Sequence, residues 1–340
     1  MLGPIEAASG RARRAFPMHR ILLVKTTSLG DVIHCLPAAS DVAAHYPGVE
    51  IDWAVEDTYA DLVRLHPAVT RVLPVAVRRW RKRVFARETR DELAAFRRSM
   101  RPHTYDRVID AQGLLKSAAL ATMAVGERHG FNARSAREGL AALTYHRRHA
   151  VPWSLDAVAR NRKLVGDALG YAPRGEPDYG IAARPARFDW LPAARYCVCL
   201  TGTTDAAKLW PEERWGALGN LLGAAGMTCV LPHGTQSELM RATRVRDAVD
   251  GALLPAALAL SEMAGLLAGA ALVIGVDTGL THLGAALGRP TIGIYCGTSP
   301  RATGVIARCA RNVGDVARTP APAAVWSAAG EICELTTPVA

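Results

Sequence analysis

Two stretches of the 340-residue chain place acidic side chains shortly after runs of apolar residues. Asp31 follows the apolar run 21–24, and the polar turn 277–279 follows the apolar run 272–276. A short apolar run that ends in a polar turn is typical of a buried parallel strand that leads into a helix. Open α/β proteins bind their ligands at such strand ends, so these residues are candidates for chemistry.

The turn at 277–279 has the composition of a site for a phosphate and a sugar. Thr278 and Gly279 place a hydroxyl and bare N–H groups at an expected helix start, where the unpaired donors and the helix dipole favour an anion by about 0.3–1 kcal/mol. Asp277 would repel that phosphate and is better placed to accept a hydrogen bond from a sugar hydroxyl. A nucleotide sugar carries both groups. The alternative is that Asp277 or Thr278 only caps a helix.

Asp31 is the candidate for the reactive group. A carboxylate at a strand end can take the proton of an attacking hydroxyl, a step that typically contributes about 10²–10⁴-fold to the rate. The alternative is that Asp31 caps a helix expected to run to Tyr46. The preceding loop contains only one glycine, so it matches neither a Walker loop nor a dinucleotide-binding fingerprint.

Two other loops add groups that bind a nucleotide. The loop after the apolar run 196–200 carries Thr203, Thr204 and Lys208, which can bind phosphate oxygens through hydroxyls and a positive charge. Glu238 could bind a ribose diol, as acidic residues do in nucleotide folds, or could only complement the dipole of a helix start.

Nothing in the spacing of acidic residues or cysteines requires a metal. No two aspartates stand two positions apart, the arrangement that would bridge a divalent cation to a diphosphate. The seven cysteines are scattered without a Cys-x-x-Cys pair, so we expect reduced core residues and no zinc site.

The positive charge of the chain is concentrated in one segment. Residues 78–101 contain ten Lys or Arg and three acids, a net +7 of the chain's +10. The most compact part of it consists of Arg78, Arg79, Trp80, Arg81, Lys82 and Arg83. This density predicts the recognition of an anion, either nucleic acid, lipid headgroups or a phosphorylated sugar, although a solvated helix face is the simpler alternative. Nucleic acid is disfavoured because only a few aromatic residues accompany the arginines, and the bases would need such side chains to stack on.

Apolar and amphipathic segments alternate along the chain in a way that predicts two doubly wound, Rossmann-like α/β domains. The expected strands are 21–24, 49–55, 72–75, 108–110, 196–200, 227–231, 272–276 and 291–295, with helices between them that include 84–100, 114–125 and 261–268. The expected divisions are a disordered extension at 1–18, a first domain at 19–172, a linker rich in Pro and Gly at 173–192, a second domain at 193–320, and a final segment at 321–340 that could cross back to the first domain. No run approaches the roughly 20 apolar residues of a membrane span, and no secretory signal is visible. We therefore expect a cytoplasmic protein that at most touches a membrane surface.

Five motifs together resemble those of the lipopolysaccharide heptosyltransferases, the glycosyltransferase family that contains the ADP-heptose transferases. They are Val24–His34, Arg78–Lys82, Ile109–Leu114, Lys208–Pro211 and Asp277–His282. The resemblance extends from about His19 to about Pro300, and the first loop favours the type I members over type II. The chain departs from the family at 295–300, where it reads Tyr-Cys-Gly-Thr-Ser-Pro.

The resemblance implies a GT-B fold, in which two Rossmann-like domains face each other across a cleft. It implies the transfer of L-glycero-D-manno-heptose from ADP-heptose to the inner Kdo of Kdo2-lipid A at the cytoplasmic face of the inner membrane, with inversion and release of ADP. It requires no cofactor, although a divalent cation is compatible with it, and it implies neither nucleic acid nor a protein partner. A type II or related ADP-sugar transferase, or a non-catalytic module that binds nucleotide or lipid A, remains an alternative.

The resemblance also assigns roles to the candidate residues. Asp31 is the general base. The donor-binding residues are Thr203, Thr204, Lys208, Glu238, Asp277, Thr278, Gly279 and His282. The acceptor-binding residues, expected to meet the carboxylates of Kdo and the phosphates of lipid A, are Arg78, Arg79, Arg81, Lys82 and Arg137.

Overall fold

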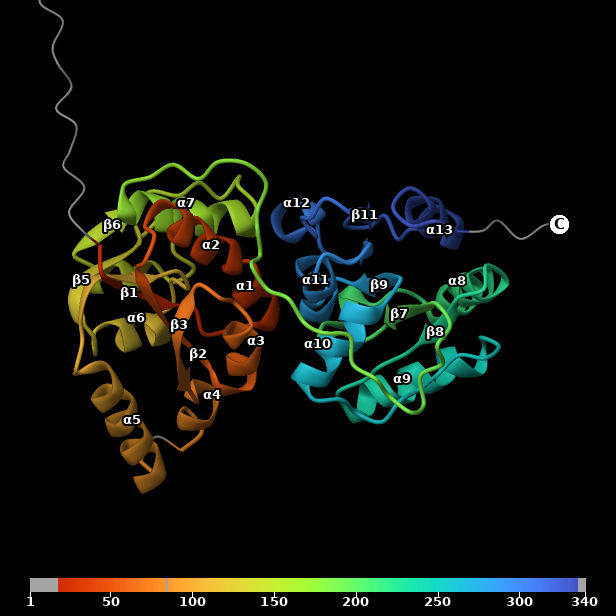
Figure 1. Ribbon diagram of the computed structural model, residues 1–340, viewed down its shortest axis with the longest axis horizontal. Coiled ribbons are helices and arrows are strands. Elements are labelled where there is room, and N and C mark those ends of the chain that lie inside the picture. Colours follow the sequence, from red (N-terminus) through yellow and green to blue (C-terminus); the bar gives the residue numbers. More distant parts are fainter. Residues whose placement is uncertain (1–17, 84, 336–340) are drawn as a thin grey trace, which may run out of the picture.

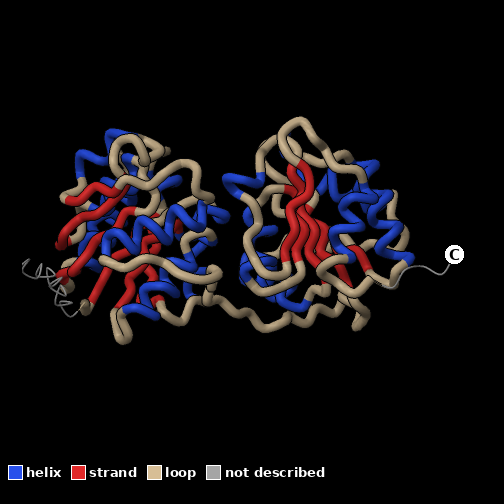
Figure 2. The backbone as a smooth tube through the Cα atoms, turned by 90° about the horizontal axis from the view of Figure 1, so that it is seen from above, coloured by secondary structure: helices blue, strands red, loops and turns tan. Residues whose placement is uncertain are grey.

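Two parallel β-sheets lie side by side in the computed structural model, which describes residues 18–83 and 85–335. Figure 1 shows each sheet surrounded by its own helices, and Figure 2 shows the extended loop that connects the two halves. We call residues 18–169 the N-terminal half and residues 196–335 the C-terminal half. The expected extension at 1–18 falls, except for its last residue, outside the described residues.

The N-terminal sheet has the strand order β3-β2-β1-β4-β5-β6, and all of its pairings are parallel. Its strands are β1 (Arg20–Val24), β2 (Glu50–Glu56), β3 (Val69–Val75), β4 (Thr104–Asp110), β5 (Val125–Phe131) and β6 (Arg147–His149). The chain leaves β1 toward β2 on one side and enters β4 on the other, so the loops after β1 and β4 diverge. This is the switch point at which a Rossmann sheet opens a crevice.

Helices of 3 to 14 residues lie between and after these strands. They are α1 (Leu29–Ile33), α2 (Leu36–His45), η1 (Asp57–Tyr59), α3 (Ala60–Arg64), α4 (Val77–Trp80), α5 (Arg87–Met100), α6 (Leu115–Ala121), η2 (Gly139–Thr144) and α7 (Ala157–Leu169).

The C-terminal sheet has the order β11-β10-β9-β7-β8, again with parallel pairings, so its switch point lies between β7 and β9. The strands are β7 (Tyr196–Leu200), β8 (Thr228–Val230), β9 (Leu272–Val276), β10 (Thr291–Tyr295) and β11 (Ala310–Gly314). The helices are η3 (Ala206–Lys208), α8 (Glu212–Ala224), α9 (Gln236–Asp247), α10 (Leu260–Gly269), α11 (Gly279–Ala286), α12 (Pro300–Thr303) and α13 (Pro322–Gly330). The prediction of an α/β protein with two parallel sheets is confirmed.

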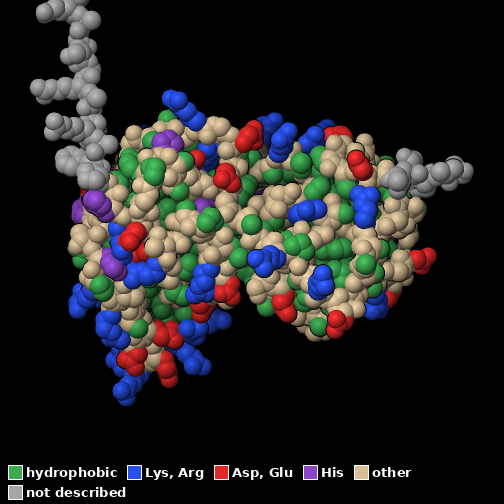
Figure 3. Space-filling view, viewed as in Figure 1, with side chains coloured by type: hydrophobic (Ala, Val, Ile, Leu, Met, Phe, Trp, Pro, Cys, Tyr) green, Lys and Arg blue, Asp and Glu red, His purple; other side chains and the backbone are tan. Residues whose placement is uncertain are grey.

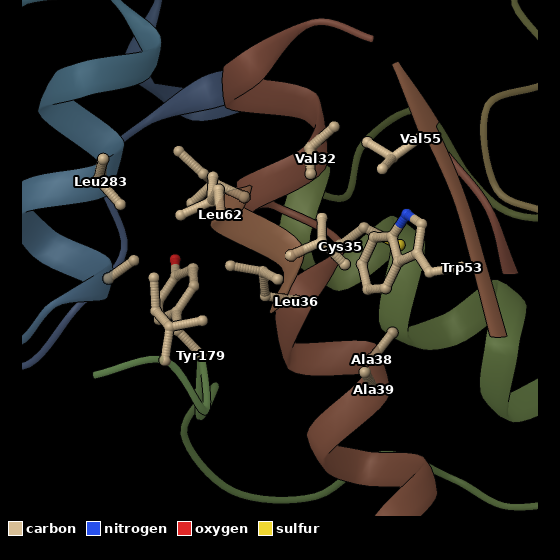
Figure 4. Packing of buried hydrophobic residues seen from close by; sticks show 14 of the residues in the cluster. Val32, Cys35, Leu36, Ala38, Ala39, Trp53, Val55, Leu62, Tyr179 and Leu283 are labelled. Atoms are coloured by element: carbon tan, nitrogen blue, oxygen red, sulfur yellow. The ribbon is translucent and has the colours of Figure 1, made fainter. Parts of the chain in front are cut away.

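One hydrophobic cluster continues from the N-terminal half into the C-terminal half. Figure 4 shows Leu283 of α11 beside Leu62 of α3 and Tyr179 of the connecting segment. The Tyr179 hydroxyl also donates to the carbonyl of Ile306, 2.8 Å away. Because apolar packing is shared, the two strand-end crevices are held next to each other.

Several predicted elements differ from the structure. The helix expected to end at Tyr46 is two helices, α1 and α2, separated at 34–35 just before Pro37, because proline fits only the start of a helix. The helix expected at 114–125 ends at Ala121, and Val125 begins a strand. Strands β5, β6 and β11 were not predicted, because their half-exposed sequences contain no continuous apolar run.

The C-terminal segment does not cross back to the N-terminal half over its described part. Helix α13 packs against α8, β10 and β11, and its Val325 and Ala329 are buried in the core of the C-terminal half. The hypothesis of a returning segment is therefore wrong for residues 322–335.

All seven cysteines are free thiols, and six of them are buried as expected. Cys309 is the exception, because its side chain is exposed. Among the described residues, no helix has the length and the apolar character needed to cross a bilayer.

Candidate functional site

Asp31 lies at the first turn of α1, in the crevice of the N-terminal sheet. Its Oδ2 accepts a hydrogen bond from the backbone N–H of Ser28 at 3.0 Å, and its Oδ1 lies 2.7 Å from Nη2 of Arg137. The cap of α1 is therefore Ser28, and Asp31 supports it from the third position of the helix. The sequence alternative of Asp31 as the cap itself is wrong. Its side chain keeps 15% of its surface exposed, so a reactant can reach it.

Positive charge surrounds the carboxylate of Asp31. Burial opposes its ionisation, but the charges of Lys25 and Arg137 outweigh burial and hold the pKa of Asp31 below its usual value. Lys25 is buried, and its Nζ donates to the carbonyl of Ala111 at 2.8 Å and to Oδ1 of Asn161 at 3.3 Å. Lys25 was not predicted as a site residue, although it belongs to the motif Val24–His34.

A cavity of about 110 Å³ opens beside this carboxylate, and both halves of the protein line it. The residues around it include Asp31, Arg137, Trp153 and Arg160 of the N-terminal half and Ala302 and Thr303 of α12. The guanidinium of Arg160 stacks 3.7 Å from the ring centre of Trp153. The cavity therefore offers a carboxylate, cations and an aromatic face to one ligand.

Three cations, Lys116, Arg78 and Arg81, lie at the mouth of this crevice. Nζ of Lys116, at the start of α6, donates to Oγ1 of Thr27 at 2.8 Å. Burial lowers the pKa of Lys116, Glu56 raises it, and the charges of Arg78 and Arg81 lower it further. The three side chains are thus close enough to repel one another, as expected of groups that receive a polyanion. Lys116 was not predicted, because a single lysine near the start of a helix has no distinctive signal.

Arg79 differs from the other members of the predicted acceptor set. Its guanidinium lies 3.2 Å from Asp57 and 2.9 Å from Glu92, and Nε1 of Trp80 also donates to Glu92. These contacts tie α4 to η1 through Asp57 and to α5 through Glu92. Lys82, by contrast, is exposed on the turn that follows α4.

Asp277 is the centre of the second crevice, at the end of β9. Its Oδ2 accepts from Oγ1 of Thr298 at 2.8 Å and lies 2.8 Å from Nζ of Lys208, while Oδ1 lies 3.5 Å from Nε2 of His282. Burial opposes the charge, but the hydrogen bonds from His282, Lys208 and Thr298 hold the pKa of Asp277 far below its usual value. Thr298 comes from the segment in which the chain departs from the family, and the sequence did not reveal its contact.

His282 also bridges the two halves. Its Nδ1 lies 3.2 Å from Nε2 of His34, the residue that ends α1. Burial and the neighbouring His282 hold the pKa of His34 well below its usual value, so this ring is neutral at pH 7. A continuous set of contacts therefore leads from α1, which carries Asp31, to Asp277. His34 was not predicted, because only the folded chain brings it to His282.

The turn at Thr278 and Gly279 packs against the N-terminal half. A Cβ on Gly279 would lie 2.8 Å from Leu29 and 3.0 Å from the backbone nitrogen of Gly30. Glycine is thus needed here for the close approach of α11 to α1. Thr278 is the N-cap residue of α11, as the sequence alternative proposed, but its side chain makes no capping hydrogen bond.

Glu238 has the structural role that the sequence left open as its alternative. Its Oε2 accepts from the backbone N–H groups of Gly234 and Thr235, at 2.8 and 3.0 Å, and thereby supports the start of α9. It also lines a cavity of about 210 Å³, together with Gly202, whose missing side chain leaves room for that of Glu238.

This second cavity has the character of a nucleoside site. Its lining consists of Leu29, Leu200, Gly202, Pro232, His233, Gly234, Glu238, Leu258, Leu260, Met263, Thr278 and Leu280. Mostly apolar walls with a few polar groups suit a flat base and a ribose. The predicted phosphate residues Thr203, half-buried, and Thr204, exposed, lie in the loop after β7 that also leads to Lys208.

Among the described residues, no three His, Cys, Asp or Glu side chains are grouped as a metal site requires.

Comparisons with known proteins agree with this arrangement. The model of glycosyltransferase family 9 (heptosyltransferase) matches residues 93–327. The chain is 45% identical over 283 residues to lipopolysaccharide heptosyltransferase 1 of Salmonella typhimurium, covering 83% of this chain and 89% of the relative. It is 44% identical over 298 residues to the protein of the same name from Pseudomonas aeruginosa, covering 87% and 83%.

Solved structures give the same result. The E. coli heptosyltransferase WaaC with ADP is similar at a TM-score of 0.85 and 40% identity, over 92% of this chain and all of the other. WaaC with ADP-2-deoxy-2-fluoro heptose is similar at 0.81, over 92% and 99%. E. coli ADP-heptose heptosyltransferase II, at 0.72 and 19% identity over 92% and 98%, shares the fold.

Proposed function

Because the chain belongs to glycosyltransferase family 9, the heptosyltransferases, we propose that it transfers heptose from ADP-heptose to the inner Kdo of Kdo2-lipid A, in the synthesis of the lipopolysaccharide inner core. Its fold is GT-B, and ADP-heptose is the donor of this family branch. The acceptor, the inversion at the anomeric carbon and the place of action at the cytoplasmic face of the inner membrane are parts of the proposal.

The position of α1 carries the proposal. This helix holds Asp31 at its first turn and packs against α11, whose first residues adjoin Asp277. A base in one half therefore stands next to a sugar and phosphate site in the other. An acceptor hydroxyl and an anomeric carbon held in these two crevices would be close together, which removes most of the entropic cost of their encounter.

The reaction we propose is a single displacement. The acceptor oxygen attacks the anomeric carbon while Asp31 takes its proton, and the bond from that carbon to the diphosphate oxygen breaks as ADP leaves with the electron pair. The new bond forms on the face opposite the leaving group, so the configuration inverts. Lys208, Thr203, Thr204 and the N-terminus of α11 would stabilise the charge on ADP through fixed dipoles and one cation.

Arg137 makes this base responsive to the acceptor. An arginine paired with a carboxylate lowers its basicity, and Nη2 of Arg137 lies 2.7 Å from Oδ1 of Asp31. Kdo is an acidic sugar, so its carboxylate can compete for the guanidinium. The binding of the acceptor would then leave Asp31 more basic when its proton is needed.

The test is direct. Purified protein is incubated with ADP-heptose and either Kdo2-lipid A or its deacylated form, and the product is weighed by mass spectrometry. We expect a product heavier than the acceptor by one heptose, formed equally well after treatment with EDTA. ADP release without a heptosylated product would reject the proposed acceptor, and loss of the reaction in EDTA would reject the expectation that the reaction requires no metal ion.

A further inference from the structure

Several large apolar side chains of the N-terminal half are exposed around the acceptor crevice. Phe85 has 93% of its surface exposed, and the others on this rim are Leu115, Leu140 and Leu143. Isolated exposed apolar residues need no explanation, but a group of them beside a charged site indicates a contact surface.

Leu115, Leu140 and Leu143 lie on one side of the cationic mouth. Leu115 precedes Lys116, and its backbone N–H donates to Oε2 of Glu138 at 2.6 Å. Helix η2 begins at the next residue and packs against α6. Leu140 and Leu143 are three residues apart in this 3₁₀ helix, so their side chains project in the same direction.

Phe85 lies in the turn between α4 and α5, which follows the edge strand β3, whereas η2 follows β5 toward the opposite edge of the sheet. The segment leaves the same edge of the sheet as Asp31, because it follows the carboxyl end of β3. Exposed cations stand next to Phe85: Arg81, Lys82, Arg83 and Arg87. Figure 3 shows Lys and Arg concentrated over this part of the N-terminal half, with fewer acids among them.

The basic surface continues along α5, beyond the residues that an acceptor headgroup would need. Arg90, Arg97 and Arg101 are exposed and are spaced by seven and four residues, so they lie on one side of the helix. Arg87 is partly neutralised by Asp91, 3.7 Å away. The remaining arginines present a row of uncompensated positive charge.

We propose that this rim, formed by Phe85, Leu115, Leu140, Leu143 and the arginines of the α4–α5 segment, docks the protein on an anionic lipid bilayer. The apolar side chains enter the interface, and the arginines bind the headgroup phosphates. Apolar side chains set among Lys and Arg are the composition of an interfacial membrane contact. The cationic mouth lies between the two apolar groups, so docking brings the crevice to the lipid surface.

This inference rests on the proposed function only for its purpose, because docking itself requires no acceptor. The first experiment therefore uses vesicles without any lipid A. The protein is sedimented with vesicles of phosphatidylethanolamine and phosphatidylglycerol, or of phosphatidylcholine alone. We expect binding to the anionic vesicles that weakens with added salt, since exposed charges are screened.

Substitutions then locate the contact. We expect Phe85→Ser to lower the vesicle partition coefficient about tenfold, the usual scale for removing one large apolar side chain from an interface. The double variant Leu140→Ser/Leu143→Ser removes two such side chains and should lower it further. The control is Met240→Ser, because Met240 is also exposed, at 56%, but lies on α9 of the C-terminal half. If Phe85→Ser and the double variant bind vesicles as well as the parent and the control do, the proposed surface is wrong.

Activity separates this inference from the proposed function. We expect Phe85→Ser to transfer heptose to a soluble deacylated acceptor at the parental rate, and to slow only with Kdo2-lipid A embedded in vesicles. An equal loss with both acceptors would overturn the docking role and place Phe85 in the reaction instead. An inactive parent that still binds anionic vesicles would reject the proposed function and leave the docking surface standing.

Discussion

The two crevices hold their key carboxylates in opposite ways. Asp277 is 6% exposed and is surrounded by Lys208, Thr298 and His282. Asp31 is 15% exposed and is paired with Arg137, whose own side chain is 49% exposed. A carboxylate enclosed by buried donors is suited to hold charge in place, whereas one paired with an exposed cation is better suited to exchange a proton. This difference is consistent with the proposed roles, in which Asp277 helps to hold the donor and Asp31 takes the proton of the acceptor.

The largest effect should come from removing the carboxylate of Asp31, the proposed general base. We expect Asp31→Asn to lower kcat about 10²–10⁴-fold, with the affinity for ADP-heptose unchanged, as measured by steady-state kinetics and calorimetry. Asp61→Asn is the control, because Asp61 also pairs with an arginine of the N-terminal half but is exposed. A nearly normal rate in Asp31→Asn would remove this residue from the mechanism.

Removing the enclosed carboxylate should change binding and stability instead. We expect Asp277→Asn to weaken ADP-heptose binding and to lower the free energy of unfolding by about 2 kcal/mol at pH 7, since a buried ion pair loses one partner. The pKa of Asp277 is depressed in the folded protein, so its contribution is present above about pH 4 and is lost as the pH falls further.

Denaturant unfolding at several pH values measures this contribution. The difference between parent and variant should shrink in acid, whereas Asp247→Asn, at an exposed ion pair of the same half, should change little at any pH. A difference that stays constant down to pH 3 would contradict the assignment.

Arg137→Ala should make the pKa values of Asp31 and Asp277 less alike. Without this guanidinium, the pKa of Asp31 should rise toward its usual value, because Arg137 is one of the charges that lower it. The acid limb of the pH profile of kcat/KM should therefore move to higher pH, and KM for the acceptor should increase. Arg147→Ala, which removes an exposed partner of Glu127, is the control. An unchanged acid limb would show that Arg137 does not tune the base.

The smallest effect should come from replacing His34, whose contact with His282 joins the two crevices. The pKa of His34 is depressed in the folded protein, so its contribution to stability is complete above about pH 6.5 and is lost as the pH falls below that value. Between pH 7 and pH 5.5 we expect His34→Gln to lose less stability than the parent, by at most about 1.4 kcal/mol per pH unit. His45→Gln, at an exposed position of α2, should follow the parent. Parallel stability curves for His34→Gln and the parent would contradict this prediction.

The sequence predicted the buried strands well and the edge strands poorly. The runs 196–200, 272–276 and 291–295 have the bounds of β7, β9 and β10, because strands buried on both faces are continuously apolar. Strand β5 contains Gly, Glu, Arg and His and is partly exposed, so no local pattern separates it from a loop. The basic segment that begins at Arg78 forms a single helical turn, α4, which is followed by the turn that carries Phe85.

The sequence by itself determined that two nucleotide-type sheets follow each other, that strand ends carry Asp31 and Asp277, and that the positive charge lies in one segment. These features are local, and they follow from side-chain type and period. Only the tertiary structure decided that Arg137 covers Asp31, that Lys208 and Thr298 close on Asp277, and that His34 meets His282. The partners are separated by about 20 to 250 residues in the chain, so no local pattern reveals them. The contacts of Asp31 and of Asp277 form as each half folds, whereas His34 meets His282 only when the halves pack together and bury their common apolar surface.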